Sequence, residues 1–120
     1  MKLGLIQGRL SKPEQGFQDT PNDWQREFLM LEELGLKHIE WIITKNSYEQ
    51  NQFFREDLSH FPINSVCADN LVDPRVGEFT YSFPILTRIC NAAIKNGVKN
   101  ITIPLLEESS VEDDEKRKKF

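Results

Sequence analysis

Short apolar runs alternate along this chain with longer segments in which apolar residues recur at helical spacing. The first run, residues 3–6, contains no charge and turns polar at Gln7-Gly8-Arg9. Uninterrupted apolar residues are typical of a parallel strand that is covered on both faces. Three later runs are short, rich in β-branched or aromatic residues and bounded by polar residues, so we expect further strands at 39–43, 63–69 and 101–106.

Helix signals lie between these runs. The segment 21–34 has an apolar stripe of helical period, with Thr20 as a cap before it and Gly35 as a left-handed stop after it. The stripe consists of Trp24, Phe28, Leu31 and Leu34. A shorter helix is expected within residues 51–61, before Pro62.

Two further helices are expected in the second half of the chain. One has Ser82 as its cap, Pro84 in its first turn and Gly97 as its stop. Its apolar face would be formed by Ile85, Leu86, Ile89, Cys90, Ala93 and Ile94. A last helix would follow Ser109 or Ser110, with acidic residues early and basic residues late, as the helix dipole favours.

An internal repeat links these elements. Residues 33–39 resemble residues 95–101, because in both places a glycine ends a predicted helix and leads into a predicted strand. The two places are separated by two units of about thirty residues, the length of one βα step. We therefore expect one α/β domain over residues 1–120, built of four parallel βα units, with the last helix cut short at Phe120.

Composition narrows the classes of partner and the cellular location. The chain has 120 residues, a formal net charge of -4 and a pI near 5.2. Nucleic-acid binding requires a basic face, so we expect no nucleic-acid partner. The apolar opening is too short for a signal peptide or a membrane span, and Cys67 and Cys90 are too few for a disulfide framework. We expect reduced, buried thiols and a cytoplasmic protein.

Polar residues at the predicted strand ends are the candidates for chemistry, because parallel βα arrays place their active sites at the carboxyl ends of the strands. Gln7 and Arg9 follow the first strand, Asp69 and Asn70 end the third, and Glu107 and Glu108 end the fourth. Glu40 lies within the second strand and is expected to point toward the same mouth. His38 and His60 precede their strands and belong to the opposite end, so we expect neither to be catalytic or to bind a metal. No P-loop, dinucleotide-binding glycine motif or nucleophile elbow follows any strand.

Several of these candidates have a structural alternative. Glu40 is either an inner-face carboxylate that holds a hydroxyl or a metal, or an outer-face carboxylate that pairs with a helix lysine. We favour the inner face, because a charge flanked by apolar strand residues needs a partner. Asp69 could equally cap the turn after its strand. Arg9 could equally form an ion pair with an acidic residue of a loop. Glu107 could equally stabilise the start of the last helix through the helix dipole.

Five short motifs occur in order along the chain. They are Ile6-Gln7-Gly8-Arg9-Leu10-Ser11, then Glu27-Phe28 before Glu33-Leu34-Gly35-Leu36, Ile39-Glu40-Trp41, Asn64-Ser65-Val66-Cys67-Ala68-Asp69, and Ile103-Pro104-Leu105-Leu106. In this order and spacing, they resemble the sugar phosphate isomerase/epimerase group of xylose isomerase-like TIM barrels. The resemblance implies a (β/α)8 barrel that binds a divalent metal and moves protons on a sugar or hydroxycarbonyl substrate through an enediol-like intermediate.

The resemblance also implies that this chain is the N-terminal half of such a barrel, since a complete one needs roughly 250 residues. The family's metal ligands and acid–base glutamates come mainly from later strands. No catalytic residue, metal ligand or metal cofactor is therefore assigned to this chain alone, and activity is expected only of the full-length barrel. The residues assigned to substrate binding are Gln7, Arg9, Glu40, Asp69 and Glu107. Related endonucleases carry histidines where this chain has Asp69 and Glu107, which argues against a nuclease.

Four strands cut from a barrel would leave the first and last strands as open edges and an apolar inner face exposed, so we expect self-association through the edges. Two other interpretations stay open at this stage. One is a non-catalytic βα module that acts through association with itself or with a partner. The other is an open, doubly wound domain of flavodoxin-like strand order, which would bind a ligand where that order reverses.

Overall fold

A computed structural model describes residues 2–11, 19–111 and 113–119, and it gives no side-chain description for residues 108, 116 and 119. The described residues form a parallel sheet of four strands, each of which pairs with the next strand along the chain. The strands are β1 (Gly4–Ile6), β2 (His38–Ile43), β3 (Ile63–Ala68) and β4 (Asn100–Thr102). The α/β class and the parallel βα units expected from the sequence are thereby confirmed.

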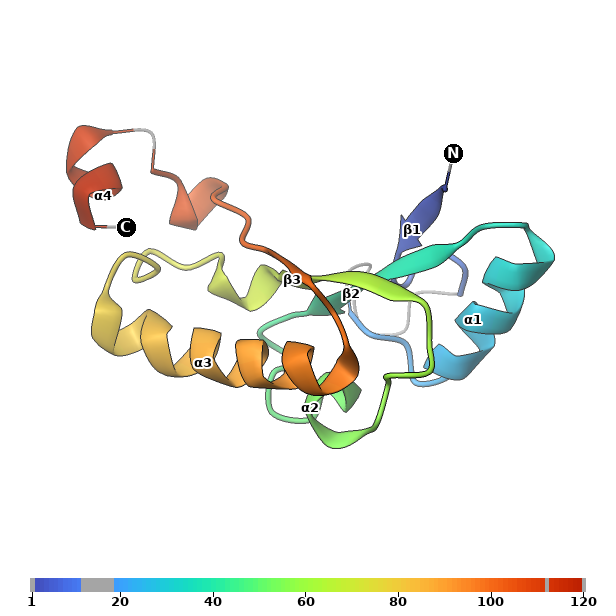
Figure 1. Ribbon diagram of the computed structural model, residues 1–120. Coiled ribbons are helices and arrows are strands. Elements are labelled where there is room, and N and C mark those ends of the chain that lie inside the picture. Colours follow the sequence, from blue (N-terminus) through green and yellow to red (C-terminus); the bar gives the residue numbers. More distant parts are fainter. Residues whose placement is uncertain (1, 12–18, 112, 120) are drawn as a thin grey trace.

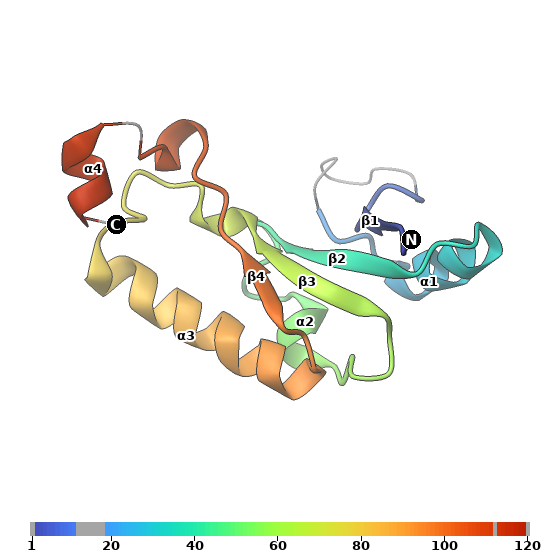
Figure 2. The same cartoon turned by 45° about the horizontal axis from the view of Figure 1, so that its top comes forward.

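Three helices in the described part of the chain connect these strands and lie on one side of the sheet (Figure 1). They are α1 (Trp24–Glu33), α2 (Gln52–Arg55) and α3 (Phe79–Asn96). The helix α4 (Asp114–Lys119) follows β4 and lies away from the strands, and the short 3-10 turns are η1 (Asp69–Leu71) and η2 (Glu107–Ser109). The turned view in Figure 2 shows the strands lying in sequence order, β1-β2-β3-β4. A flavodoxin-like fold requires the strand order to reverse and helices on both faces. That alternative is therefore wrong, whereas a βα module with sequential strands agrees with the arrangement.

One apolar core lies between the sheet and the helices. Alternate residues of β2, namely Ile39, Trp41 and Ile43, point into this core, and Trp41 is fully buried. The Trp41 ring meets the ring of Trp24 from α1 edge-to-face, with the ring centroids 5.5 Å apart. Because side chains alternate along a strand, Glu40 and Ile42 point to the opposite face, which we call the open face.

The internal repeat is confirmed at the level of hydrogen bonds. Gly35 and Gly97 have φ values of 72° and 71°, in the left-handed region that glycine adopts without strain. The amide of the next residue reaches back in each case, with 3.0 Å from Leu36 to Leu31 and 2.8 Å from Val98 to Ala93. Both helices thus end in the same Schellman-type turn and lead directly into a strand.

The helix starts differ from the expected ones. The first helix begins at Trp24 instead of residue 21, because the hydroxyl of Thr20 donates to the carbonyl of Ile42 at 3.1 Å and does not cap α1. The long helix α3 begins at Phe79, and Ser82 lies inside it, with its hydroxyl donating to the carbonyl of Val76. The Thr20 hydroxyl thus contacts a residue distant in sequence, whereas the Ser82 hydroxyl bonds to the loop just before its own helix.

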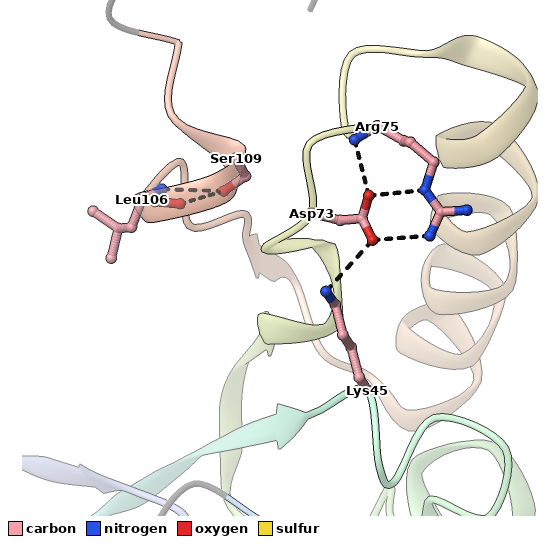
Figure 3. Close-up of polar contacts among 5 residues, drawn as sticks. All are labelled: Lys45, Asp73, Arg75, Leu106 and Ser109. Carbon is pink, nitrogen blue, oxygen red and sulfur yellow. Dashed lines mark hydrogen bonds and ion pairs between the residues drawn. The ribbon is translucent and has the colours of Figure 1, made fainter.

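Several expectations at the chain's second half are also corrected. Cys90 is exposed and Cys67 is only partly buried, so the expectation of two buried thiols is wrong for Cys90. Neither Ser109 nor Ser110 caps α4, which begins at Asp114. The Ser109 hydroxyl instead accepts from the amide of Leu106 at 3.1 Å and closes the turn η2 (Figure 3).

Two expected features fall partly or wholly outside the described residues. Most of the polar loop between the first strand and the first helix lies at 12–18, and the early acidic residue Glu112 lies beyond the described range. Within the ranges that are described, no helix is both long enough and apolar enough to cross a membrane.

Candidate functional site

A row of polar side chains crosses the open face of the sheet. One oxygen of the Glu40 carboxylate, Oε2, accepts from the hydroxyl of Ser65 at 2.6 Å and lies 3.2 Å from the hydroxyl of Thr102. The three residues come from β2, β3 and β4, and we call them the polar row. The register shifts by one residue between Ile39 and Glu40, which places Ser65 beside Glu40.

The polar row decides between the two interpretations of Glu40. Its carboxylate is half-buried on the face away from the helices and bonds to strand hydroxyls, so it is not paired with a helix lysine on the outer face. The open face was expected to be apolar. Polar groups from three adjacent strands cross it instead, because a carboxylate this close to the sheet surface needs hydrogen-bond donors.

Two more acidic side chains stand at the ends of the last two strands, and we call them the acidic rim. Asp69 follows β3 as the first residue of η1, and Glu107 begins η2 after β4. Burial raises the pKa of Asp69, and the charges of Glu107 and Asp19 raise it further, whereas Lys45 lowers it. Like charges thus converge on this side of the sheet, and a donor-rich ligand would relieve them.

The backbone at Glu107 is in the left-handed region, with φ at 50°. Residues other than glycine seldom adopt this conformation, and where they do, the surrounding structure holds them there at a cost of about 1 kcal/mol. Such positions cluster at functional sites. Glu107 is exposed and lies close enough to raise the pKa of Asp69, so the strained turn presents a carboxylate next to the other member of the acidic rim.

A buried amide oxygen lies in the same turn as Asp69. Asn70 is 4% exposed, and its Oδ1 has no hydrogen-bond partner among the described atoms. Buried polar atoms are nearly always paired, so an unpaired one next to the acidic rim is a candidate acceptor for a ligand hydroxyl. Asp69 does not serve as a side-chain cap of η1, whose cap position is Ala68.

Cys67 lies between the polar row and the acidic rim. Burial, with the charges of Glu40 and Asp69, raises its pKa to about 12. A thiol with so high a pKa stays protonated at neutral pH and is a poor nucleophile and metal ligand. Cys67 therefore has a packing role on this surface, and the nearby carboxylates are the candidates for polar contacts with a ligand.

Gln7 is not on the open side of the sheet. It is 1% exposed, and its Oε1 lies 3.2 Å from both the amide of Ile42 and the hydroxyl of Thr20. Asn51 completes this group: it accepts from the Trp41 indole at 2.8 Å and donates to the carbonyl of Ile42 at 3.0 Å. We call Gln7, Thr20, Trp41 and Asn51 the buried corner. The polar groups there satisfy one another and hold the ends of β1 and β2 together.

Arg9 follows β1 in a turn that is fixed by a residue from α1. Arg9 is half-buried, and the amides on either side of it, from Gly8 and Leu10, each donate to the Glu27 carboxylate at 2.9 Å. Glu27 is 1% exposed. Its role was not predicted, but an acidic residue on the same helix stripe as Trp24 and Phe28 was the available signal.

A buried carboxylate paired with two half-exposed cations joins two loops at this end of the sheet, and this contact was not predicted (Figure 3). Asp73 accepts from the Arg75 guanidinium through two bonds of 2.9 Å and lies 3.4 Å from Nζ of Lys45. These bonds hold the pKa of Asp73 well below its ordinary value. The guanidinium also stacks on the Tyr81 ring, 4.0 Å from its centroid. Asp73 thereby ties the turn after β2 to the loop before α3.

The described residues do not make a complete metal site. No group of three or more His, Cys, Asp or Glu side chains in the described ranges is arranged to hold a metal ion. Asp69 and Glu107 offer carboxylate oxygens only as a pair, so we derive no chemical step that runs through a metal. His38 starts β2 and His60 precedes β3, which places both at the amino end, as expected.

A separate groove of about 440 Å³ lies at the amino end of the sheet. Apolar residues of α1 and of the entry to β3 line it, among them Phe28, Leu31, Phe61 and Pro62. It contains no member of the polar row or the acidic rim. This apolar groove and the candidate chemistry are therefore at opposite ends of the strands.

Comparisons of this chain with protein-family models, with curated protein sequences and with solved structures give no match.

Proposed function

We propose that this chain forms one wall of the substrate pocket of a metal-dependent sugar (phosphate) isomerase/epimerase-like barrel. The observation that carries the proposal is the Glu40 carboxylate, which two strand hydroxyls hold on the open face. Both of these contacts fall on Oε2, and a carboxylate has lone pairs on two oxygens, so Glu40 retains acceptor capacity for hydroxyls of a ligand. The sequential parallel strands support the same assignment.

In this proposal, each side of the site has a distinct part in binding. Glu40 accepts from a hydroxyl of the sugar, and the fixed positions of Ser65 and Thr102 orient its carboxylate. Asp69, whose carboxylate is partly buried near the charge of Glu107, accepts a hydrogen bond from another ligand hydroxyl. The planar guanidinium of Arg9 can donate two parallel hydrogen bonds to a phosphate or carboxylate group. This chain's residues bind and orient the substrate, and the chain is expected to be inactive alone.

Calorimetric titration tests the proposal directly. Aldoses, ketoses and their phosphates are titrated into the full chain, and at least one class is expected to bind at millimolar concentration or below. Glu40→Gln should weaken that binding by roughly tenfold, the loss of one charge-assisted hydrogen bond. The matched variant Glu33→Gln, on the exposed end of α1, should leave it unchanged. Equal binding by both variants, or no binding by any sugar, would contradict the proposal.

A second candidate is a non-catalytic βα module that acts through association, and the sheet edges favour it. β1 and β4 lie at the two edges of the described sheet, and Leu3 and Ile6 near the first edge are 57% and 40% exposed. Unpaired edge strands with exposed apolar residues are templates for pairing with another chain. If the edges associate, Ile6→Lys should lower the sedimentation mass of the protein. Sugar binding without any association would favour the pocket wall alone.

A further inference from the structure

An exposed apolar line runs along α3. Its members are Phe79, Phe83, Leu86, Cys90 and Ile94, which we call the α3 stripe. Their spacing of four, three, four and four residues places them on one side of the helix. Phe79, Phe83 and Ile94 are 72%, 54% and 79% exposed. The two phenylalanine rings stack on each other, with their centroids 4.7 Å apart.

The α3 stripe carries no charge, and among its members only Leu86 is partly buried and packs against the core. The buried residues of α3 lie on another side of the helix: Ser82, Ile89, Ala92, Ala93 and Asn96. The helix has two charged residues, and both turn toward α2. Arg88 lies over the Phe54 ring at 3.8 Å, and Nζ of Lys95 donates to the carbonyl of Phe54 at 3.3 Å. The stripe is therefore a neutral surface on a chain with 28% charged residues.

We propose that the α3 stripe is the contact surface between two copies of this chain, packed with their α3 helices antiparallel. A two-fold contact requires the same patch on both copies to be self-complementary. In the antiparallel register that sets Phe79 opposite Ile94 of the second copy, Phe83 lies opposite Cys90 and the two Leu86 side chains meet near the axis. Each aromatic ring then faces a smaller apolar side chain, as interdigitated packing requires.

Charge and area both favour a second copy as the occupant. Each chain carries a formal net charge of -4, so two copies associate most readily where neither presents a charge. The helix of 18 residues is about 27 Å long, which sets the length of the contact. The exposed parts of the stripe and its polar flank would bury on the order of 1,000 Å² in total, the size of a weak, reversible interface. The contact does not depend on sugar binding.

Sedimentation of the full chain from micromolar to millimolar concentration tests the contact. The wild-type protein should form dimers, and Phe83→Glu should raise the dimer dissociation constant by roughly tenfold or more, because it places two charges in an apolar contact. Leu29→Glu, at a 63% exposed position on α1, is the matched control and should leave the dissociation constant unchanged. Circular dichroism checks that both variants keep their fold.

A double substitution tests the register. In the antiparallel arrangement, Phe83 faces Cys90 of the second copy, so Phe83→Glu combined with Cys90→Lys should restore the dimer by opposite charges, whereas each single change weakens it. Restoration supports the proposal and this register. A wild-type monomer at millimolar concentration would overturn the proposal, as would dissociation by Leu29→Glu or Ile6→Lys but not by Phe83→Glu. Sugar titration of the Phe83→Glu variant reports separately on the pocket wall.

Discussion

Polar residues that follow β1 and β2 have a different role from those that follow β3 and β4. At β1 and β2, the buried corner pairs Gln7 and Asn51 with backbone groups and with the Trp41 indole, and both residues are 1% exposed. At β3 and β4, Asp69 is only half-buried, Glu107 is exposed, and the two repel each other. Where polar groups satisfy one another, they stabilise the fold. Where polar groups stay accessible and repel one another, as Asp69 and Glu107 do, they are available to a ligand.

The difference follows from what covers each strand end. Thr20 and Asn51 come from segments that return over the ends of β1 and β2, and they bring hydrogen-bond partners with them. Among the described residues, no side-chain hydrogen bond to Asp69 is seen, and burial with like charge outweighs the charge of Lys45, so the pKa of Asp69 is raised. Four substitutions test this contrast, beginning with the largest expected effect.

Asn51→Ala should damage the buried corner most. It removes the side-chain cap of α2 and leaves the Trp41 indole and the carbonyl of Ile42 without their Asn51 bonds. We expect a loss of about 3 kcal/mol in the free energy of unfolding, measured by urea denaturation. Asn46→Ala, at an exposed turn, is the control and should change it by less than about 0.5 kcal/mol. Equal effects would mean that the corner is not a stabilising network.

Glu27→Gln should have the second-largest effect. The carboxylate accepts from the amides of Gly8 and Leu10, and a neutral amide gives weaker bonds with only one accepting oxygen. The expected loss is about 2 kcal/mol by chemical denaturation. Glu33→Gln, on the same helix but exposed, should be close to neutral. An unchanged stability in Glu27→Gln would show that the turn around Arg9 does not need this residue.

Asp73→Asn should cost about 1 kcal/mol at neutral pH, since Arg75 and Lys45 are half-exposed and water screens the pairs. The folded protein holds the pKa of Asp73 below its ordinary value of 3.8, so its stabilisation is present above that value. It is lost as the pH falls through 3.8 toward the folded-state pKa. Denaturation at pH 7 and pH 3 should therefore show a smaller gap between variant and wild type at pH 3. A gap that widens at low pH would contradict the assignment.

Asp69→Asn should have the smallest effect and the opposite sign. The raised pKa of Asp69 means that its ionised form costs stability above the ordinary value of 3.8. Removing the charge should raise the free energy of unfolding by about half a kcal/mol at pH 7, and the gain should vanish below pH 3.8. If the variant is instead less stable at pH 7, Asp69 belongs with the stabilising residues of the buried corner.

The sequence predicted the framework of the fold well, for physical reasons. Apolar runs identify buried strands, and Gly35 and Gly97 end helices because only glycine enters the left-handed region without strain. The ends of the first three strands were located to within one residue, whereas β4 ends at Thr102, four residues before the expected end at residue 106. Helix starts were predicted less well, since Thr20 bonds to a distant strand and Ser82 bonds to the loop before its own helix, and cap patterns encode neither contact.

The sequence did not predict which polar residues are buried as part of the fold and which stay accessible to a ligand. Gln7 and Glu40 were both predicted to contact substrate, yet Gln7 is enclosed in the buried corner and Glu40 lies on the open face. That outcome depends on the alternation along β2 and on the one-residue shift that brings Ser65 beside Glu40. The exposed side of α3 was missed for a similar reason. Helical spacing identifies an apolar stripe, but it does not show which part of the stripe the sheet covers.

Ligands are expected to bind across the polar row and the acidic rim and not in the buried corner, and amide chemical shifts of the ¹⁵N-labelled chain distinguish the two places. During titration with sugars and sugar phosphates, we expect shifts at Ser65, Asp69 and Thr102, with Gln7 and Asn51 unchanged. Shifts centred on Gln7 and Asn51, or no shifts at saturating sugar, would contradict this expectation.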